Sequence, residues 1–347
     1  MISSLLDLSY PANVHIQAFA DDITLVVAGK TRLQIQTLAN KTLHMIHTWS
    51  NQHHITFNPS KCNFILIGNH YLKRPPTIKL GNHNIRHTHE LNILGIIFDH
   101  KLSFIPHTTY LRDKIYKHTI ALSLFSGLHW GFSPKHFRAL YTRSLERIIT
   151  YGAPVFFQPT PNSHLIRKLI SIQRIPLLKI CKAFSTVSNA SINILTNILP
   201  IEYTLNREIA LFHIFQLKQP YTLHTNIQGN DIADYLANTS RHTGTPVNLF
   251  PNKQYIRKQI RQQQYILWNS KWRENHSTTP VFKWIPSVFT IPEYFPTSYL
   301  QTQILTDHGR FPYYFYRFHR SPHNICPCGQ QADNFTHYTT TCTLTTQ

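Results

Sequence analysis

Two adjacent carboxylates, Asp21 and Asp22, lie between two runs of strand-forming residues, 14–19 and 23–28. Such runs around a short polar centre predict a β-hairpin whose tight turn carries both acids. Because like charges repel, adjacent carboxylates at a turn favour a bound cation, and two divalent metal ions that assist phosphoryl transfer would be such cations. A solvated Asp-Asp turn without a ligand is the alternative that the dipeptide alone leaves open.

A second set of potential metal ligands lies near the C-terminal end, in the pattern C-x-C-x8-H-x4-C. Its members are Cys326, Cys328, His337 and Cys342. Three thiolates and one imidazole can form a tetrahedral Zn²⁺ site, although the first spacing departs from the usual C-x2-C finger. Three free thiols in a partly ordered tail are the alternative. The two other cysteines, Cys62 and Cys181, are expected to be small core residues.

The elements that must position the acidic turn are an antiparallel sheet and one helix. Apolar residues between Ile35 and Trp49 recur at three- and four-residue steps, which predicts an amphipathic helix on one face of the sheet. Further extended runs are expected at 55–57, 63–67, 78–80 and 91–98. Beyond residue 100 the pattern becomes helical, with helices predicted over 110–128, 134–150 and 163–184. The expected fold class is α+β.

The chain is strongly basic, with 34 Lys and Arg against 15 Asp and Glu and a formal charge of +19. This excess favours a polyanionic partner, usually nucleic acid, although an anionic membrane surface would also suit it. The candidates for phosphate contacts on the predicted helices are Lys114, Lys117, Arg138, Arg143 and Arg147. An ordinary solvated face is the alternative. Trp268 and Trp272 in a later basic segment could stack bases, but packing within the protein is the more common role of tryptophan.

Three motifs occur in a fixed order: Phe19-Ala20-Asp21-Asp22, then 57–62 (FNPSKC), then 91–99 (LNILGIIFD). Together they resemble the palm motifs of reverse transcriptases from non-LTR (LINE-type, jockey-like) retrotransposons. The resemblance implies RNA-directed DNA synthesis on an RNA and DNA template–primer, with two Mg²⁺ ions held by the Asp21-Asp22 hairpin and a further aspartate. It also implies that Lys61 assists proton transfer to pyrophosphate, with a plain surface lysine as the alternative.

The segment 224–237 (HTNIQGNDIADYLA) resembles the last motif of ribonuclease H. The resemblance makes His224 the histidine of a mobile loop and Asp234 a metal ligand, with Asp231 as a further acid of the motif. The other carboxylates of that domain have no counterpart upstream, so a remnant is expected, a lone helix on a loop. One carboxylate cannot hold two metal ions, and no cleavage of RNA–DNA hybrids is expected.

The resemblance divides the chain into five expected regions. They are a partial reverse-transcriptase palm (1–100), a helical thumb or connection (101–220), a ribonuclease H remnant (221–245), a basic helical linker (246–300) and a zinc-knuckle-like C-terminal segment (301–347). The strand with the other palm aspartate and the fingers have no counterpart, and the resemblance places Asp7 on a helix instead. The isolated chain is therefore expected to be an inactive fragment of an RNA-directed DNA polymerase. The alternative is a catalytically dead remnant that binds nucleic acid.

Five cysteines, an odd number, argue against a disulfide scaffold and fit a reducing compartment. The N-terminal segment has no basic lead and is interrupted by Asp7, unlike a signal peptide. No apolar run approaches the roughly 20 residues that span a bilayer. The expectation is an intracellular protein, in the nucleus or cytoplasm, without a membrane partner.

Overall fold

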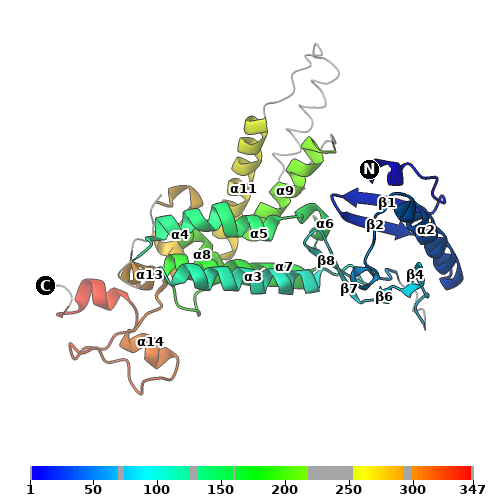
Figure 1. The fold of residues 1–347 in the computed structure, drawn as a ribbon. Coiled ribbons are helices and arrows are strands. Elements are labelled where there is room, and N and C mark those ends of the chain that lie inside the picture. Colours follow the sequence, from blue (N-terminus) through cyan, green and yellow to red (C-terminus); the bar gives the residue numbers. More distant parts are fainter. Residues whose placement is uncertain are drawn as a thin grey trace, which may run out of the picture. The chain divides into compact units, whose positions relative to one another are not determined.

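The structure is a computed structural model that describes residues 2–68, 74–125, 131–158, 161–217, 253–292 and 298–344. The chain forms two compact units, Met1–His107 and Thr108–Gln347. Figure 1 shows strands confined to the first unit and a second unit built mainly of helices. The mixed helix-and-strand class is thus confirmed. The ribonuclease H-like segment, with His224, Asp231 and Asp234, lies outside the described residues.

The predicted acidic hairpin is present in the first unit. Strands β1 (Val14–Phe19) and β2 (Asp22–Val27) pair antiparallel, with Phe19 opposite Asp22. Alternate residues of β1 are partly buried and exposed, as expected for a strand with one covered face. The loop is therefore the two residues Ala20 and Asp21. The expectation that the turn carries both acids is wrong for one of them, because Asp21 lies in the turn and Asp22 is already the first residue of β2.

Helix α2 (Arg32–Gln52) covers the hairpin, as the apolar spacing predicts. Thr31 caps its N-terminus, because the side chain accepts a hydrogen bond from the Gln34 amide. Ile46 and Trp49 lie one turn apart and form a buried cluster with Leu5 of the short helix α1 (Ile2–Leu6). Apolar side chains of β1 and β2 pack against this cluster. Burial of this one face holds the hairpin in place.

The remaining strands of the first unit are shorter than the sequence predicts. They are β3 (Asn63–Phe64), β4 (Lys79–Leu80), β5 (His83–Asn84), β6 (Arg86–His87), β7 (Glu90–Ile93) and β8 (Ile96–Asp99). The described strands form four separate two-stranded sheets, β1–β2, β3–β6, β4–β5 and β7–β8. The run 55–57 forms no strand. Polar residues interrupt the apolar stretches, so each pair has only a short face to bury.

The helices that follow the strands are α3 (Ile105–Ser123), α4 (Pro134–Leu140), the π-helical turn η2 (Tyr141–Leu145), α5 (Glu146–Thr150), α6 (Ala153–Phe156), α7 (Ser163–Cys181), α8 (Asn189–Thr196) and α9 (Ile201–Phe215). The helices predicted over 110–128, 134–150 and 163–184 correspond to α3, to the run from α4 to α5, and to α7, with shifts at their ends. Helices α6, α8 and α9 were not predicted. Ser133 and Asn162 cap α4 and α7, because each side chain accepts a hydrogen bond from a backbone amide of the first turn. The predicted helix 134–150 is continuous but contains the π-helical turn, which carries the fully buried Tyr141.

A buried amide on α7 joins several of these helices. The Gln173 side chain donates to the Tyr141 hydroxyl and to the Leu199 carbonyl, at 3.2 and 2.8 Å. Its oxygen accepts from the Ile201 backbone amide at 2.9 Å. Because each buried polar atom has a partner, the site fixes the helix positions without an unsatisfied group.

A second group of helices follows in the chain: α11 (Lys253–Asn275), α12 (Pro280–Trp284) and the 3₁₀ turn η3 (Val288–Thr290). Helix α11 runs beside α9 (Figure 1). Trp268 and Trp272 lie one turn apart on its buried side, and the Trp272 indole donates to the Ile285 carbonyl at 2.9 Å. These two tryptophans therefore pack inside the protein and do not present a stacking surface.

The C-terminal segment contains α13 (Tyr299–Thr306), α14 (Pro312–Arg317) and the π-helical turn η4 (His337–Thr341). It packs against the loop that follows α7. The Thr302 hydroxyl donates to the Cys181 carbonyl at 2.6 Å, and Thr186 shares hydrogen bonds with His308 and Tyr314. Among the helices that the structure describes, none is both long and apolar enough to cross a bilayer.

Candidate functional site

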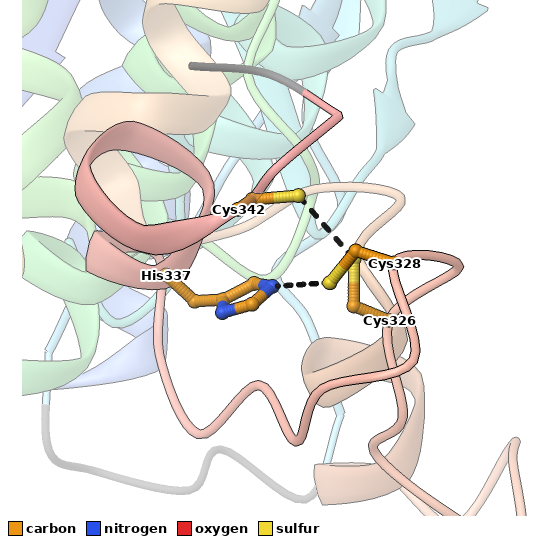
Figure 2. Close-up of side chains that lie close together, drawn as sticks. All are labelled: Cys326, Cys328, His337 and Cys342. Atoms are coloured by element: carbon orange, nitrogen blue, oxygen red, sulfur yellow. Dashed lines mark hydrogen bonds between the residues drawn. The ribbon is translucent and has the colours of Figure 1, made fainter.

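The four predicted zinc ligands lie together at the C-terminal end (Figure 2). The Cys326 and Cys342 sulfurs are 3.7 Å apart, and the Cys328 sulfur is 3.4 Å from Nε2 of His337. All four potential ligand atoms lie within 4.8 Å of one another. Zn–S and Zn–N bonds of ordinary length give tetrahedral edges of about 3.8 Å between sulfurs and roughly 3.5 Å between sulfur and nitrogen. The two paired distances thus have the size that a shared Zn²⁺ requires.

Local turns bring the ligands to one point. Gly329 has a positive φ of 84°, and its amide donates to the Cys326 carbonyl across the Cys-Pro-Cys-Gly turn. This turn places two thiols on one short loop. The Cys342 amide donates to the His337 carbonyl at 2.8 Å, so η4 holds the other two ligands on one turn.

Thr341 determines how the His337 ring is presented. Its hydroxyl lies 3.2 Å from both the His337 carbonyl oxygen and ring atom Nδ1. If the hydroxyl donates to the carbonyl, it can accept from Nδ1–H, and this leaves the lone pair of Nε2 facing the Cys328 sulfur. A hydrogen bond to the second ring nitrogen is the usual way to fix a metal-binding imidazole.

The metal-ligand set belongs to a buried cluster. Cys326 and Cys342 are almost fully buried and lie in the same core cluster as Tyr313 and Tyr314. Burial and the neighbouring Cys328 and Cys342 thiols raise the pKa of the Cys326 thiol to about 11. A thiolate here is unfavourable unless a cation is present. Three thiols and one imidazole of this geometry fit a structural Zn²⁺, which would supply that charge and hold the segment folded.

The acidic hairpin has a different character. Asp21 and Asp22 are both exposed, and Ala20 takes a positive φ of 54° in the turn before them. The residue that can take this conformation most easily is glycine. Within the described residues, Cys326, Cys328, His337 and Cys342 are the only group of three or more close potential ligands. Among the described residues, no third potential metal ligand lies close to the two carboxylates of the hairpin.

Asp99, the last residue of the third motif, has a structural role that the sequence did not reveal. Its carboxylate accepts from the amides of Lys101, Ser103 and Phe104 and from the Ser103 hydroxyl, at 2.7–3.2 Å. Burial opposes its ionisation, but these hydrogen bonds prevail and the pKa of Asp99 lies below its usual value. The bonds hold a loop in which Phe104 has a positive φ. Asp99 is therefore committed to the loop and is not free to bind a metal ion.

Lys61 ends the short 3₁₀ turn η1 (Pro59–Lys61) and is exposed. In the described part of the chain, no hydrogen bond or ion pair joins Lys61 to Asp21 or Asp22. Cys62 beside it is only partly buried, whereas Cys181 is fully buried as expected.

The five basic candidates separate into two groups. Lys114 and Lys117 on α3, and Arg143 on η2, are exposed, and the Lys114 ammonium lies 5.7 Å from the Tyr110 ring. Arg138 donates to the Asn197 carbonyl at 3.1 Å, and Arg147 pairs with Glu208 of α9 at 3.1 Å. The first group can reach a phosphate freely, while the second also holds helices together.

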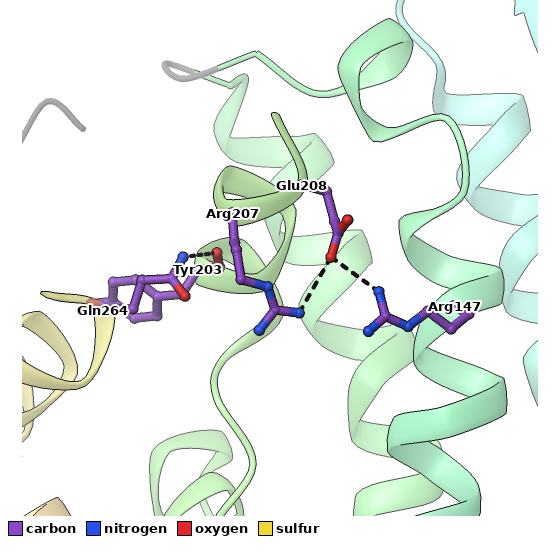
Figure 3. A network of polar contacts seen from close by, with 5 residues as sticks. All are labelled: Arg147, Tyr203, Arg207, Glu208 and Gln264. Atoms are coloured by element: carbon purple, nitrogen blue, oxygen red, sulfur yellow. Dashed lines mark hydrogen bonds and ion pairs between the residues drawn. The ribbon is translucent and has the colours of Figure 1, made fainter. Parts of the chain in front are cut away.

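A network of charged residues around Arg147 was missed in the sequence (Figure 3). Arg147 and Arg207 donate to the same oxygen of Glu208, while the Gln264 amide of α11 donates to the Tyr203 carbonyl. Glu146 is buried beside them. Burial raises its pKa, although the Arg207 and Arg147 charges act in the opposite direction. The only sequence signal was the presence of glutamates on helices of a chain with few acids.

Comparison with known proteins gives no match to any family model and none to a solved structure. Curated sequences do match. The "Putative 115 kDa protein in type-1 retrotransposable element R1DM" of Drosophila melanogaster is 25% identical over 335 residues, which cover 95% of this chain and 31% of the relative. The "Retrovirus-related Pol polyprotein from type-1 retrotransposable element R1" of Bradysia coprophila is 25% identical over 348 residues, with coverages of 99% and 33%.

The chain is homologous to Pol polyproteins of non-LTR retrotransposons. A third relative, the "RNA-directed DNA polymerase from mobile element jockey" of Drosophila melanogaster, is 26% identical over 176 residues, 42% of this chain and 19% of that protein. The chain spans about a third of the length of the two R1 relatives. The R1 and jockey matches confirm the resemblance drawn from the three motifs.

Proposed function

We propose that this chain is part of an RNA-directed DNA polymerase of a non-LTR retroelement, with Asp21 and Asp22 in its metal site. The observation that carries the proposal is the exposed pair Asp21 and Asp22, at the turn and at the start of β2, in a chain homologous to retroelement Pol polyproteins. In this role the carboxylates would bind Mg²⁺, whose charge activates a primer hydroxyl and stabilises the leaving pyrophosphate. The hairpin packed on α2 would be the palm portion.

These 347 residues alone would bind template–primer without extending it. Two Mg²⁺ ions carry four positive charges, and the hairpin offers two carboxylates. Asp99 is occupied by four hydrogen-bond donors, and Asp7 follows the last residue of α1. A further carboxylate would have to come from another part of the functional polymerase. Lys61 would assist proton transfer to pyrophosphate only when a bound nucleoside triphosphate lies close to both Lys61 and the Asp21-Asp22 hairpin.

The helices of the second unit would form the thumb-like surface that holds the nucleic acid backbone. The support is the +19 charge and the exposure of Lys114, Lys117 and Arg143. Binding of this kind releases condensed counterions, so affinity should fall steeply with salt and depend little on sequence. The alternative is a catalytically dead remnant that binds nucleic acid. It would use the same basic surface, but its acidic hairpin would take no part in DNA synthesis.

Primer extension on an RNA template with Mg²⁺ or Mn²⁺ tests the proposal. The chain alone should bind the template–primer but extend it no more than the Asp21→Ala variant does. A longer Pol protein that contains this chain should extend it, and Asp21→Ala should abolish that activity, because a metal ligand is lost. A longer active protein that tolerates Asp21→Ala would contradict the assignment of the hairpin. Extension by the chain alone that Asp21→Ala abolishes would contradict the need for a further carboxylate.

A further inference from the structure

Helix α14 and the turn after it form a surface that the proposed function does not yet include. From Tyr313 to Arg320 the sequence reads YYFYRFHR, in which four aromatic residues are followed by Arg317, Phe318, His319 and Arg320. Tyr313 and Tyr314 are buried in the core cluster of the C-terminal segment. Tyr316 and Phe318 are instead 49% and 43% exposed. Tyr313 and Tyr314 therefore pack the helix against the core, while the rings of Tyr316 and Phe318 remain partly exposed.

The backbone after α14 holds this surface in a fixed shape. His319 takes a left-handed φ of 54°, and its amide donates to the Tyr316 carbonyl at 3.0 Å. The Arg320 amide donates a hydrogen bond to the Phe315 carbonyl at 2.8 Å. This is the hydrogen-bonding pattern of a helix that ends in a tight reversal. Rings on such a turn need little further ordering when a ligand binds.

Contacts with buried residues also hold the Phe318 ring and the helix that carries it in place. The Phe318 ring lies 4.7 Å from the buried Tyr314 ring, and the Arg317 guanidinium lies 6.0 Å from the Phe318 ring. The Tyr314 hydroxyl bonds the Thr186 hydroxyl at 2.8 Å, which joins α14 to the loop after α7. The surface thus rests on the body of the second unit.

The sequence around this surface contains more basic residues than acids. From residue 307 to the last residue, the sequence contains Arg310, Arg317 and Arg320 and two acids, Asp307 and Asp333. Asp307 accepts a hydrogen bond from the hydroxyl of the buried Tyr313. Asp333 accepts a hydrogen bond from the Asn324 amide at 2.8 Å. In the part of the chain that the structure describes, neither Arg317 nor Arg320 forms an ion pair.

We propose that Tyr316, Arg317, Phe318, His319 and Arg320, the aromatic–basic face, bind single-stranded nucleic acid. The aromatic rings would stack on unpaired bases, and the arginines would contact the phosphates between them. In a duplex the faces of the bases are stacked on one another and cannot stack on a side chain. Exposed aromatic rings beside cations therefore favour binding of a single strand over binding of a double helix. This inference rests on the proposed nucleic-acid function and deepens it by naming a site and a form of the substrate.

The test is fluorescence anisotropy with the full, zinc-loaded chain and matched single-stranded RNA, single-stranded DNA and duplex oligonucleotides. Each stacked base contributes about 1–3 kcal/mol, which is roughly 5- to 150-fold in Kd. Tyr316→Ala should therefore raise the Kd for both single strands at least about fivefold and change the duplex Kd less than twofold. Tyr255→Ala is the matched control, because Tyr255 is also a helix tyrosine and is 59% exposed. Tyr316 lies outside the buried cluster, so this variant should keep its fold.

A charge variant supplies an independent measurement. Arg317→Gln with Arg320→Gln should lower the slope of log K against log salt for single strands by about 1.4, because each phosphate contact contributes about 0.7. Unchanged single-strand binding in both variants, or equal losses for single strand and duplex, would overturn the aromatic–basic face. If the natural chain binds no nucleic acid at all, the proposed function itself fails.

Discussion

The acidic hairpin and the Cys/His centre bring potential metal ligands together in different ways. Asp21 and Asp22 are neighbours in sequence, so local strand pairing is enough to present them, and both stay exposed. Cys326 and Cys342 are 16 residues apart and meet inside a buried aromatic cluster. Among the described residues, no third potential ligand lies beside the two carboxylates of the hairpin, whereas the Cys/His centre brings four potential ligands together. Adjacent residues make a conspicuous motif, but a complete metal site requires tertiary packing.

Removal of one potential zinc ligand is expected to have the largest effect of the changes in either region. Cys328→Ser should abolish binding of one zinc ion per chain and expose residues 299–344 to hydrogen exchange, because structural zinc contributes on the order of 10 kcal/mol to folding such segments. Elemental analysis and hydrogen exchange measure the two effects.

Cys62→Ser is the matched control, since Cys62 lies outside the Cys/His set. It should retain the zinc and the protection. A metal content near zero in the natural chain, unaltered by Cys328→Ser, would favour the free-thiol interpretation.

In the first unit, the largest effect is expected at Asp99. Asp99→Asn should lose about 2–3 kcal/mol of local stability at pH 7, because the amide cannot accept from all four donors. Hydrogen exchange of the Ser103 and Phe104 amides measures this loss. Since the pKa of Asp99 is lowered in the folded state, its contribution is complete above the unfolded pKa of about 4 and is lost as the pH falls through the folded value. The difference between variant and natural chain should therefore shrink in acid.

Glu90→Gln provides the comparison for Asp99, because Glu90 is exposed and pairs directly across from it. That change should leave the loop protection unaltered. Equal protection in the natural chain and Asp99→Asn would show that the strands alone fix the loop.

A smaller effect is expected at the hydrogen bond that orients His337. Thr341→Val should weaken zinc binding about 10- to 100-fold while the ligands remain, because the ring loses the partner of Nδ1. Competition with a chromogenic chelator measures the affinity. Thr340→Val removes a neighbouring hydroxyl that bonds the Thr336 carbonyl instead, and it should change the zinc affinity little. Similar losses in both variants would indicate a general effect on η4.

The smallest effect concerns the acidic turn. Ala20→Gly should stabilise the hairpin by up to about 1 kcal/mol, because glycine takes the positive φ of Ala20 without a steric cost. The exchange rates of the amides paired across β1 and β2 measure this gain. Ala18→Gly, at a strand position opposite Ile23, should instead weaken the hairpin. If Ala20→Gly destabilised the hairpin, the positive φ of Ala20 would not be a source of backbone strain.

Several elements could be predicted from local sequence because local forces suffice for them. The hairpin 14–27, helix α2 and the capped starts of α4 and α7 follow from strand propensity, apolar spacing and side-chain caps. The sequence also identified the four residues of the Cys/His set and the homology to non-LTR retroelements.

Other features were decided only by tertiary structure, because they depend on which groups meet across the chain. The Asp99 carboxylate became a loop anchor when four donors converged on it. Arg138 and Arg147 found partners on distant segments, while Lys117 and Arg143 stayed exposed. Trp268 and Trp272 are both buried, and the indole of Trp272 donates to the Ile285 carbonyl after α12. Residue type and spacing determine what a side chain can do, but burial and the available partners determine which of those interactions it makes.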